Sequence, residues 1–234
     1  MKKFLLVSLF AIMLSPSYAQ LFKIAGHEVG FVYVGPKVGM NFSEISNWSE
    51  LAGVENKSRT GFQIGAVGEI GLTSMLSFQG EVTFVSKGMK NTFTGGESQY
   101  KVNYLGIPLL AKLSFKAMGL SKIYALGGVY SDVRTGGKYV TEFDTGETFE
   151  ENLSSTGWTR MDWGMMLGAG AEYETKYGIF GLDLRYSQGF VDVHSSDASK
   201  NRNRSFGFAV VYKYDLVDLF FRLKNKKNEE APSE

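Results

Sequence analysis

The sequence contains no cysteine, only two histidines and only four prolines among its 234 residues. Without cysteine the chain cannot form disulfides, thiolate metal sites or a cysteine nucleophile, so a small disulfide-stapled domain is excluded. No apolar run beyond residue 19 approaches the roughly 20 residues that a membrane-spanning helix needs. The formal net charge of +1 provides no basic stripe that would favour nucleic acid. Any crossing of a membrane would therefore have to be made by strands.

The N-terminus has the pattern of a secretory signal peptide. Lys2 and Lys3 precede an apolar stretch over residues 4–14, and Ser17-Tyr18-Ala19 then offers small residues at the positions that a signal peptidase reads. This pattern predicts a signal peptide over residues 1–19, cleaved before Gln20. Because Gln20 is not a cysteine, a lipoprotein anchor is excluded. The remaining chain has the length of one barrel or sandwich domain, with residues 20–32 expected to be a periplasmic segment.

Residues 180–187 read FGLDLRYS and show a strict alternation of side-chain character. Apolar and aromatic residues occupy every second position, whereas glycine, charged residues and serine occupy the positions between them. Side chains alternate across a β-strand with a period of two, so one face of this strand is continuously apolar.

The same alternation recurs along the chain and predicts an all-β, eight-stranded antiparallel up-and-down transmembrane β-barrel over residues 33–214. The facing is ambiguous only in the segment 122–132. The eight predicted strands lie near 33–43, 61–70, 76–87, 101–115, 122–132, 162–173, 180–187 and 204–214. Short turns are expected at 71–75, 116–121 and 174–178, and long polar loops at 44–60, 88–100, 133–161 and 190–203. Both chain ends are then periplasmic.

Alternation alone also fits a soluble lipocalin-like barrel or a sandwich with its apolar face turned inward. Glycines on the polar face, such as Gly164 and Gly168, favour the membrane barrel, because they suit a crowded lumen and weaken a solvent-facing strand. Aromatic residues near strand ends, such as Trp163 and Tyr186, are typical of interfacial girdles. Residues 215–234 are expected to form a periplasmic tail. Its part 215–224 is either a short interfacial helix or an extension of the last strand, and the rest is disordered.

Five segments carry a resemblance to a known family: VGPKVGMNFSEIS, LSFQGEVTFVSKG, YLGIPLLAKLSF, MDWGMMLGAGAEY and LDLRYSQGF. They resemble the successive strands of the outer-membrane β-barrel family of Bacteroidota, described as porin-like or PorT-like. The resemblance covers Val34 to Tyr214, and G-x-K-x-G-x-N and Y-L-x-I-P-L-L-x-K are its most specific strings. It implies an eight-stranded barrel in the outer membrane. It implies little about function, although one relative is an accessory barrel of the type IX secretion and gliding machinery.

Charged residues on the polar faces of the strands are the first candidate site. Nine of them are expected to point into the lumen: Lys37, Glu69, Glu81, Lys87, Lys112, Glu172, Asp183, Arg185 and Lys213. Isolated charges in a narrow lumen would cost several kcal/mol each, so they should form ion pairs. An eight-stranded barrel is just wide enough for side chains to fill it. The hypothesis is a structural network of salt bridges, with a gated pore or proton path as the alternative.

Three further groups of residues suggest other chemistry. Asp192, His194 and Ser195 lie side by side and invite a hydrolase hypothesis, but adjacent loop residues rarely hold triad geometry. The acidic segment with Glu142, Asp144, Glu147, Glu150 and Glu151 could bind Ca²⁺, although it lacks EF-hand spacing. Cations near the outer rim could contact lipid A phosphates. These are Arg134, Lys138, Arg160, Lys200, Arg202 and Arg204.

The sequence thus predicts a non-enzymatic outer-membrane barrel that needs no cofactor or metal. Its expected partners are outer-membrane lipid and lipopolysaccharide, and a protein of the envelope bound through the long surface loops or the periplasmic end. The alternatives are a narrow porin-like channel for ions or small solutes and an accessory barrel of a protein-secretion machine.

Overall fold

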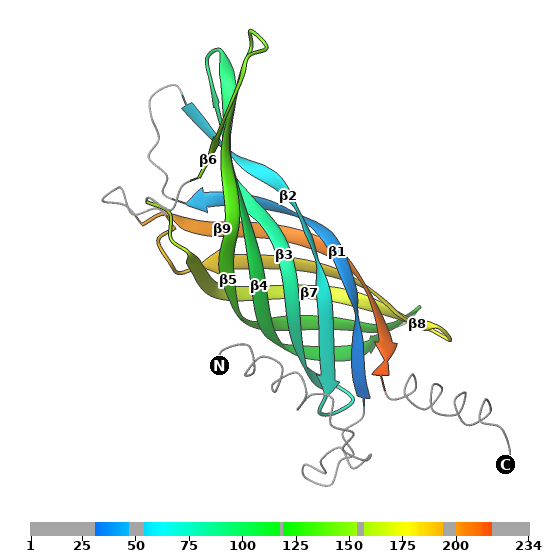
Figure 1. The fold of residues 1–234 in the computed structure, drawn as a ribbon. Helices are drawn as coiled ribbons and strands as arrows, with labels where there is room; N and C mark the ends of the chain where they lie inside the picture. Colours follow the sequence, from blue (N-terminus) through cyan, green and yellow to red (C-terminus); the bar gives the residue numbers. More distant parts are fainter. Residues whose placement is uncertain (1–30, 47–53, 118, 154–156, 194–199, 217–234) are drawn as a thin grey trace, which may run out of the picture.

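The computed structural model describes residues 31–46, 54–117, 119–153, 157–193 and 200–216. These residues form one antiparallel sheet of nine strands that closes on itself (Figure 1). The strands are β1 (Phe31–Ser46), β2 (Val54–Gly71), β3 (Leu76–Phe93), β4 (Gly96–Ala117), β5 (Leu120–Phe143), β6 (Thr148–Asn152), β7 (Met161–Thr175), β8 (Gly178–Gly189) and β9 (Arg202–Asp215). The predicted signal peptide and most of the segments 20–32 and 215–234 lie outside the described residues. Within the described ranges, no helix is long and apolar enough to cross a membrane.

Eight of the strands form the barrel, and their order follows the sequence. Each strand pairs with its neighbours, and β1 closes the ring by pairing with β9, as in Val38 opposite Val210. The short strand β6 pairs only with β5 and lies outside this ring. The predicted fold class, an antiparallel up-and-down barrel, is therefore confirmed.

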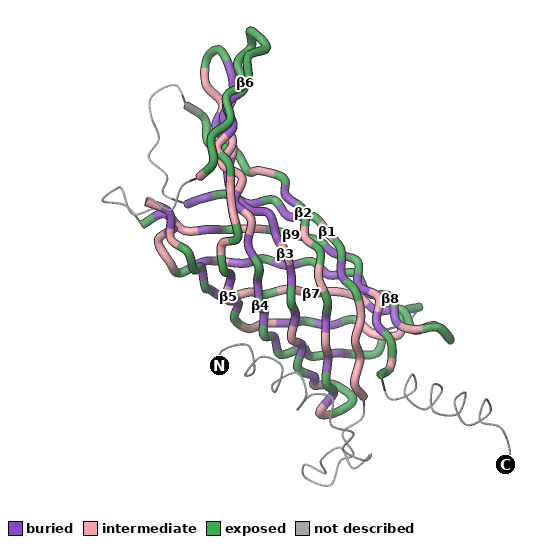
Figure 2. Tube along the Cα trace, viewed as in Figure 1, coloured by how far each residue is buried: buried purple, intermediate pink, exposed green. Residues whose placement is uncertain are grey.

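Inward and outward positions alternate along the strands, as the change of burial from residue to residue shows (Figure 2). On β8 the side chain of Leu184 is 46% exposed, whereas its neighbour Asp183 is 2% exposed. The facing of the segment 122–132, which was ambiguous in the sequence, is resolved as well. Tyr124 and Tyr130 of β5 point inward, and Val129 is exposed. The outer surface of the barrel is thus a continuous apolar band, which is the surface that lipid requires.

The prediction of long polar loops at 88–100 and 133–161 is wrong over most of these ranges. β3 and β4 continue to a tight turn at Thr94 and Gly95, where Gly95 has a φ of 97°. β5 continues to Phe143, and β6 then runs back beside it. The first and last long loops are also shorter than expected, since β2 begins at Val54 and β9 at Arg202. The strands extend beyond the segments of alternating apolar residues because, outside lipid, neither face of a strand has to be apolar.

The extended strand ends form a protruding sheet at one end of the barrel, which we call the hairpin end (Figure 1). The protruding sheet consists of residues 54–58 of β2, 89–93 of β3, 96–103 of β4, 134–143 of β5, and β6. Irregularities of register, between Ser58 and Gln63 on β2 and between Asn103 and Tyr104 on β4, separate this sheet from the ring. Such bulges increase the local twist, which allows the sheet to leave the barrel wall. The opposite end, at the start of β1 and the end of β9, is called the turn end.

Replacing Leu184 by arginine puts a cation near the middle of the apolar band. We expect Leu184→Arg to lower the unfolding free energy by about 2–4 kcal/mol, as measured by urea unfolding of the barrel in phospholipid vesicles. Leu120, which is also exposed but follows the turn at Gly119, provides the control. Leu120→Arg should cost about 0–1 kcal/mol, because the penalty falls toward the membrane interface. Equal costs for the two variants would contradict a lipid-facing band.

Candidate functional site: the filled lumen and the protruding sheet

The nine charged residues expected in the lumen all lie inside the ring of strands. None has more than 6% of its side chain exposed. Together with Asp132 and Asp162 they form three clusters along the barrel axis, and each cluster contains both signs of charge.

The cluster nearest the turn end consists of Lys112, Lys213, Glu69 and Glu172. Both lysines contact both glutamates: Lys112 Nζ lies 3.1 Å from Glu69 Oε2, and Lys213 Nζ lies 2.5 Å from Glu172 Oε1. The other two contacts, from Lys112 to Glu172 and from Lys213 to Glu69, complete a four-membered ring. Ser77 Oγ also donates to Glu69 Oε1 at 2.7 Å. Two cations and two carboxylates therefore neutralise each other away from solvent.

The central cluster is organised around Glu81 of β3. Its two carboxylate oxygens accept from different cations, Lys37 Nζ at 2.9 Å and Arg185 Nη2 at 2.7 Å. Arg185 also pairs with Asp183, which accepts a hydrogen bond from the Tyr124 hydroxyl. The contacts join residues of β1, β3, β5 and β8, so the cluster ties strands together across the lumen.

The cluster nearest the hairpin end contains two carboxylates that were not among the predicted site residues. Lys87 Nζ lies 2.7 Å from Asp132 Oδ2 and 3.8 Å from Asp162 Oδ2. Asn203 Nδ2 donates to Asp162 Oδ2 at 2.9 Å, and Lys87 Nζ lies 4.4 Å from the centroid of the Tyr130 ring. Asp132 was missed because the facing of its strand was ambiguous. The signal that could have found Asp162 was its place on the polar face of its strand, next to Trp163 on the apolar face.

Side chains leave little free volume between these clusters. A cavity of about 50 Å³ remains between the central cluster and Lys87, lined in part by Lys37, Arg185 and Asp132. That volume admits only a few waters. Charges enclosed in this way are costly when single, and tolerable only when paired and hydrogen-bonded. The arrangement is suited to holding strands together, and the space between these clusters is too small for a substrate.

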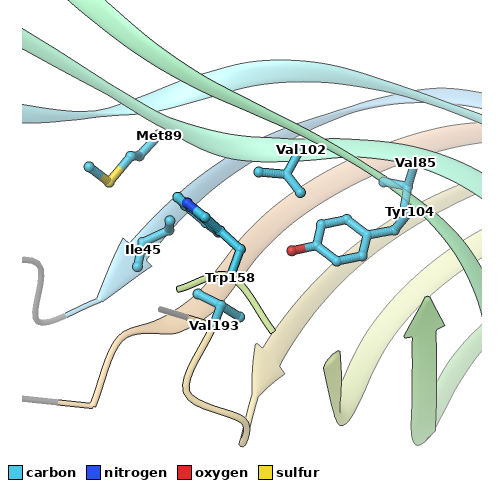
Figure 3. Close-up of a cluster of buried hydrophobic side chains, with 7 residues drawn as sticks. All are labelled: Ile45, Val85, Met89, Val102, Tyr104, Trp158 and Val193. Carbon is cyan, nitrogen blue, oxygen red and sulfur yellow. The ribbon is translucent and has the colours of Figure 1, made fainter. Parts of the chain in front are cut away.

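Apolar side chains close the lumen at the hairpin end (Figure 3). This apolar cap consists of Ile45, Val85, Met89, Val102, Tyr104, Trp158 and Val193. Trp158 and Val193 come from the segments between strands, and backbone hydrogen bonds hold these segments over the lumen. Thr159 N donates to Val193 O at 3.0 Å, and Val193 N donates to Asn201 O at 2.8 Å. The charged clusters are thereby separated from the solvent at this end.

The protruding sheet presents charged and aromatic side chains on its two faces. On one face Lys90 pairs with Glu97, and this hydrogen bond lowers the pKa of the Glu97 carboxyl from its ordinary value. On the other face, aromatic rings pack against one another across strands, as between Tyr100 and Tyr139, whose centroids lie 4.7 Å apart with the rings tilted by 43°. Phe149 of β6 lies on this aromatic face with 54% of its side chain exposed.

The remaining candidate residues are dispersed. Of the hydrolase hypothesis only Asp192 is described, because His194 and Ser195 lie outside the described residues. The five acidic residues Glu142, Asp144, Glu147, Glu150 and Glu151 lie on and around the β5–β6 hairpin. In the described part of the chain, no group of three or more acidic or histidine side chains is placed to hold a metal.

The six rim cations do not form a single cluster. Arg134 and Lys138 lie on β5, whereas Arg202 and Arg204 lie on β9. Lys138 Nζ pairs with Glu150 Oε2 at 3.0 Å, and Arg204 Nε donates to Gln188 Oε1 at 2.9 Å. Arg160 and Lys200 are exposed in the segments between strands. Any anion that binds at the rim would therefore contact a few of these cations, not all of them.

Comparison with known families agrees with this architecture. The family model described as "Outer membrane protein beta-barrel domain" matches residues 18–195. The chain belongs to this family. It is therefore an outer-membrane β-barrel protein, and its apolar band faces lipid. No curated protein sequence matches the chain significantly.

Three solved structures illustrate the likeness of fold. Ail of Yersinia pestis has 13% identity and a TM-score of 0.39, with 79% of this chain and 100% of Ail covered. OprG from Pseudomonas aeruginosa has 14% identity and a TM-score of 0.44, with 82% and 100% covered. Neisserial surface protein A has 13% identity and a TM-score of 0.42, with 80% and 100% covered. At such identities the likeness concerns the fold alone.

Removing the lysine of the hairpin-end cluster should destabilise the barrel strongly. Lys87→Met leaves Asp132 and Asp162 without the cation that they share, so we expect a loss of about 3–5 kcal/mol in unfolding free energy. Lys138→Met removes a comparable but exposed pair and should cost about 0–1 kcal/mol. Urea unfolding in vesicles measures both. Adding Asp132→Asn to Lys87→Met should recover part of the loss, and no recovery would argue against a charge imbalance as its cause.

Proposed function

We propose that the protein is a non-enzymatic, closed outer-membrane barrel that holds its protruding sheet outside the cell, where the sheet binds a protein partner of the envelope or surface. The observation that carries this proposal is the combination of a filled lumen with an ordered sheet beyond the membrane. The hairpin end is extracellular in this proposal, because short turns are typically periplasmic and long excursions extracellular.

The filled lumen supports an anchoring role over transport. The three charged clusters occupy the lumen along its axis, and the apolar cap covers them at the hairpin end. A channel for ions or small solutes would require these ion pairs to separate, and each broken buried pair costs several kcal/mol. Between the charged clusters of the described lumen, the same enclosure leaves no space in which a bound substrate could meet a nucleophile and a base.

Two finer assignments belong to the proposal. The residues of the strand motifs, from Val34 to Tyr214, support a place among the PorT-like barrels of Bacteroidota, of which one relative is an accessory barrel of a secretion machine. Arg204 is exposed directly beyond the outward aromatic residue Phe206 on β9. A cation at that level of the barrel is suited to contact a lipopolysaccharide phosphate through charge-assisted hydrogen bonds.

Recordings in planar lipid bilayers test the closed state of the barrel. We expect the purified protein to give no stepwise conductance over a wide range of voltage. The quadruple variant Lys37→Ala, Glu81→Ala, Asp183→Ala, Arg185→Ala removes both cations and both carboxylates of the central cluster, so that no unpaired charge is left behind, and any leak should increase. A steady ohmic conductance of the unmodified protein would favour the channel over the anchor.

Capture of partners from the native membrane tests the role of the protruding sheet. In one variant an Asn-Gly turn joins Tyr139 directly to Glu151, which form a hydrogen-bonded pair, so the hairpin tip is removed and the ring is kept. The control is a chain that ends at Asp215 and lacks the tail. We expect the first variant to lose a stoichiometric protein partner that the control retains. Loss in the control alone would move the binding site to the periplasmic end.

A further inference from the structure

The outer edge of β6 is an open sheet edge at the tip of the protruding sheet. β6 pairs with β5 on one side, and among the described residues no strand pairs with its other side. All five of its residues are exposed. An edge of this kind presents unpaired backbone N–H and C=O groups to which another extended chain can add.

The register of the hairpin shows which backbone groups are free. Phe143 N donates to Glu147 O at 2.9 Å, and Leu153 N donates to Gly137 O at 3.0 Å. Because hydrogen-bonded pairs alternate in an antiparallel ladder, Phe149 and Glu151 also direct their backbone groups toward β5. Thr148, Glu150 and Asn152 therefore direct their N–H and C=O groups outward.

The side chains along this edge define the chemistry of an added strand. Glu147, Phe149 and Glu151 project to the aromatic face, since they lie opposite Phe143, Thr141 and Tyr139. An antiparallel strand added here would place three of its side chains opposite these residues. Cross-strand pairs are stabilised by opposite charges and by apolar contact, so a matching strand carries basic, apolar and basic residues at alternate positions.

We infer that the edge of β6 binds a partner polypeptide by strand addition, and that the added segment has the alternating pattern basic–x–apolar–x–basic. This inference rests on the proposed function and names the class of partner for the protruding sheet. Of the acidic residues on β6 itself, Glu150 is paired with Lys138, whereas no ion pair joins Glu151 to another described residue. The carboxylate of Glu151 therefore favours a cationic chain.

A second copy of this protein is a poor occupant of the edge. Copies in one membrane direct their hairpin ends the same way, so two β6 strands could meet only in parallel. Their glutamates would then face one another, and like charges directly opposite are destabilising. The edge is consequently available to a different polypeptide.

Disulfide trapping on the full-length chain can test the inference, because the chain has no cysteine of its own. The variant Asn152→Cys supplies one thiol, and the probe is the peptide Cys-Lys-Thr-Val-Thr-Lys. In antiparallel register its cysteine lies opposite position 152, and its Lys, Val and Lys lie opposite Glu151, Phe149 and Glu147. The yield of mixed disulfide in a glutathione buffer reports binding at this edge.

Two N-methylated peptides separate strand addition from simple charge attraction. Methylation of the first threonine blocks the N–H that should donate to Glu150 O, whereas methylation of the valine blocks an N–H that points away from β6. We expect the first peptide to be trapped about fivefold less than the second, which corresponds to one lost hydrogen bond. Equal trapping of the two, or no trapping of the unmodified peptide above a Cys-Glu-Thr-Val-Thr-Glu control, would overturn the inference.

Variants of the edge provide a second and independent test. Glu150→Pro, combined with Asn152→Cys, removes the outward N–H without removing a donor to β5, and proline is tolerated on such an edge. Glu150→Gln removes the charge but retains the N–H. Trapping should be lost with proline and retained with glutamine, and the opposite result would overturn the inference.

The native partner distinguishes failure of this inference from failure of the proposed function. Capture from the native membrane compares Glu150→Pro with the variant that lacks the hairpin tip. Loss of the partner in both supports strand addition. If proline retains a partner that the shortened hairpin loses, strand addition is wrong and the sheet binds through its face. If both variants retain the partner, the protruding sheet is not its binding site.

Discussion

The absence of hydrogen-bonding partners in lipid is the constraint on which the rest of this structure depends. A backbone inside the membrane has to satisfy its own N–H and C=O groups, and a sheet can do so only when it has no edge. The pairing of β1 with β9 removes that edge. With eight strands the resulting ring is narrow, so every inward side chain has to fit beside those of the other strands. The filled lumen is therefore a direct consequence of the closure.

Glycine is the residue that makes the crowded lumen possible. A side chain on Gly170 would begin 2.3 Å from the hydroxyl of Tyr124, and the missing side chain lets Tyr124 reach Asp183. Gly106 serves in the same way, since a Cβ there would lie 2.3 Å from Asp132 Oδ1. The glycines on the polar faces thus leave the space that the large and charged side chains of the lumen occupy. Charge enters the lumen because the outward face has to be apolar, and pairing makes this charge tolerable.

The sequence predicts the barrel strands, whose outward side chains have to be apolar in lipid, and little of the protruding sheet, which water surrounds. The period of two in FGLDLRYS located β8, and the same pattern placed Leu184 outward and Arg185 inward without knowledge of the ring. It failed for the continuations of β3, β4 and β5, where strands such as the one containing Thr141 carry polar residues on both faces. The pairs of the lumen network could not be predicted either. Which lysine meets which glutamate depends on the stagger of distant strands, as for Lys213 and Glu69, which are 144 residues apart.

The two ends of β5 lie in different surroundings, one in the barrel wall that faces lipid and the other in the protruding sheet that faces water. Residues 122–133 of β5 pair with β7, whereas residues 138–142 pair with β6, and β4 pairs with β5 along both parts. The neighbour of β5 therefore changes from a strand of the ring to a strand outside it where the protruding sheet begins. This exchange creates the free edge of β6, which would be intolerable in the membrane and is permitted outside it. Proteins usually protect such edges with charge, and here the charge is acidic. An acidic edge repels copies of itself while it remains open to a basic chain, so the feature that prevents self-association also selects the kind of partner.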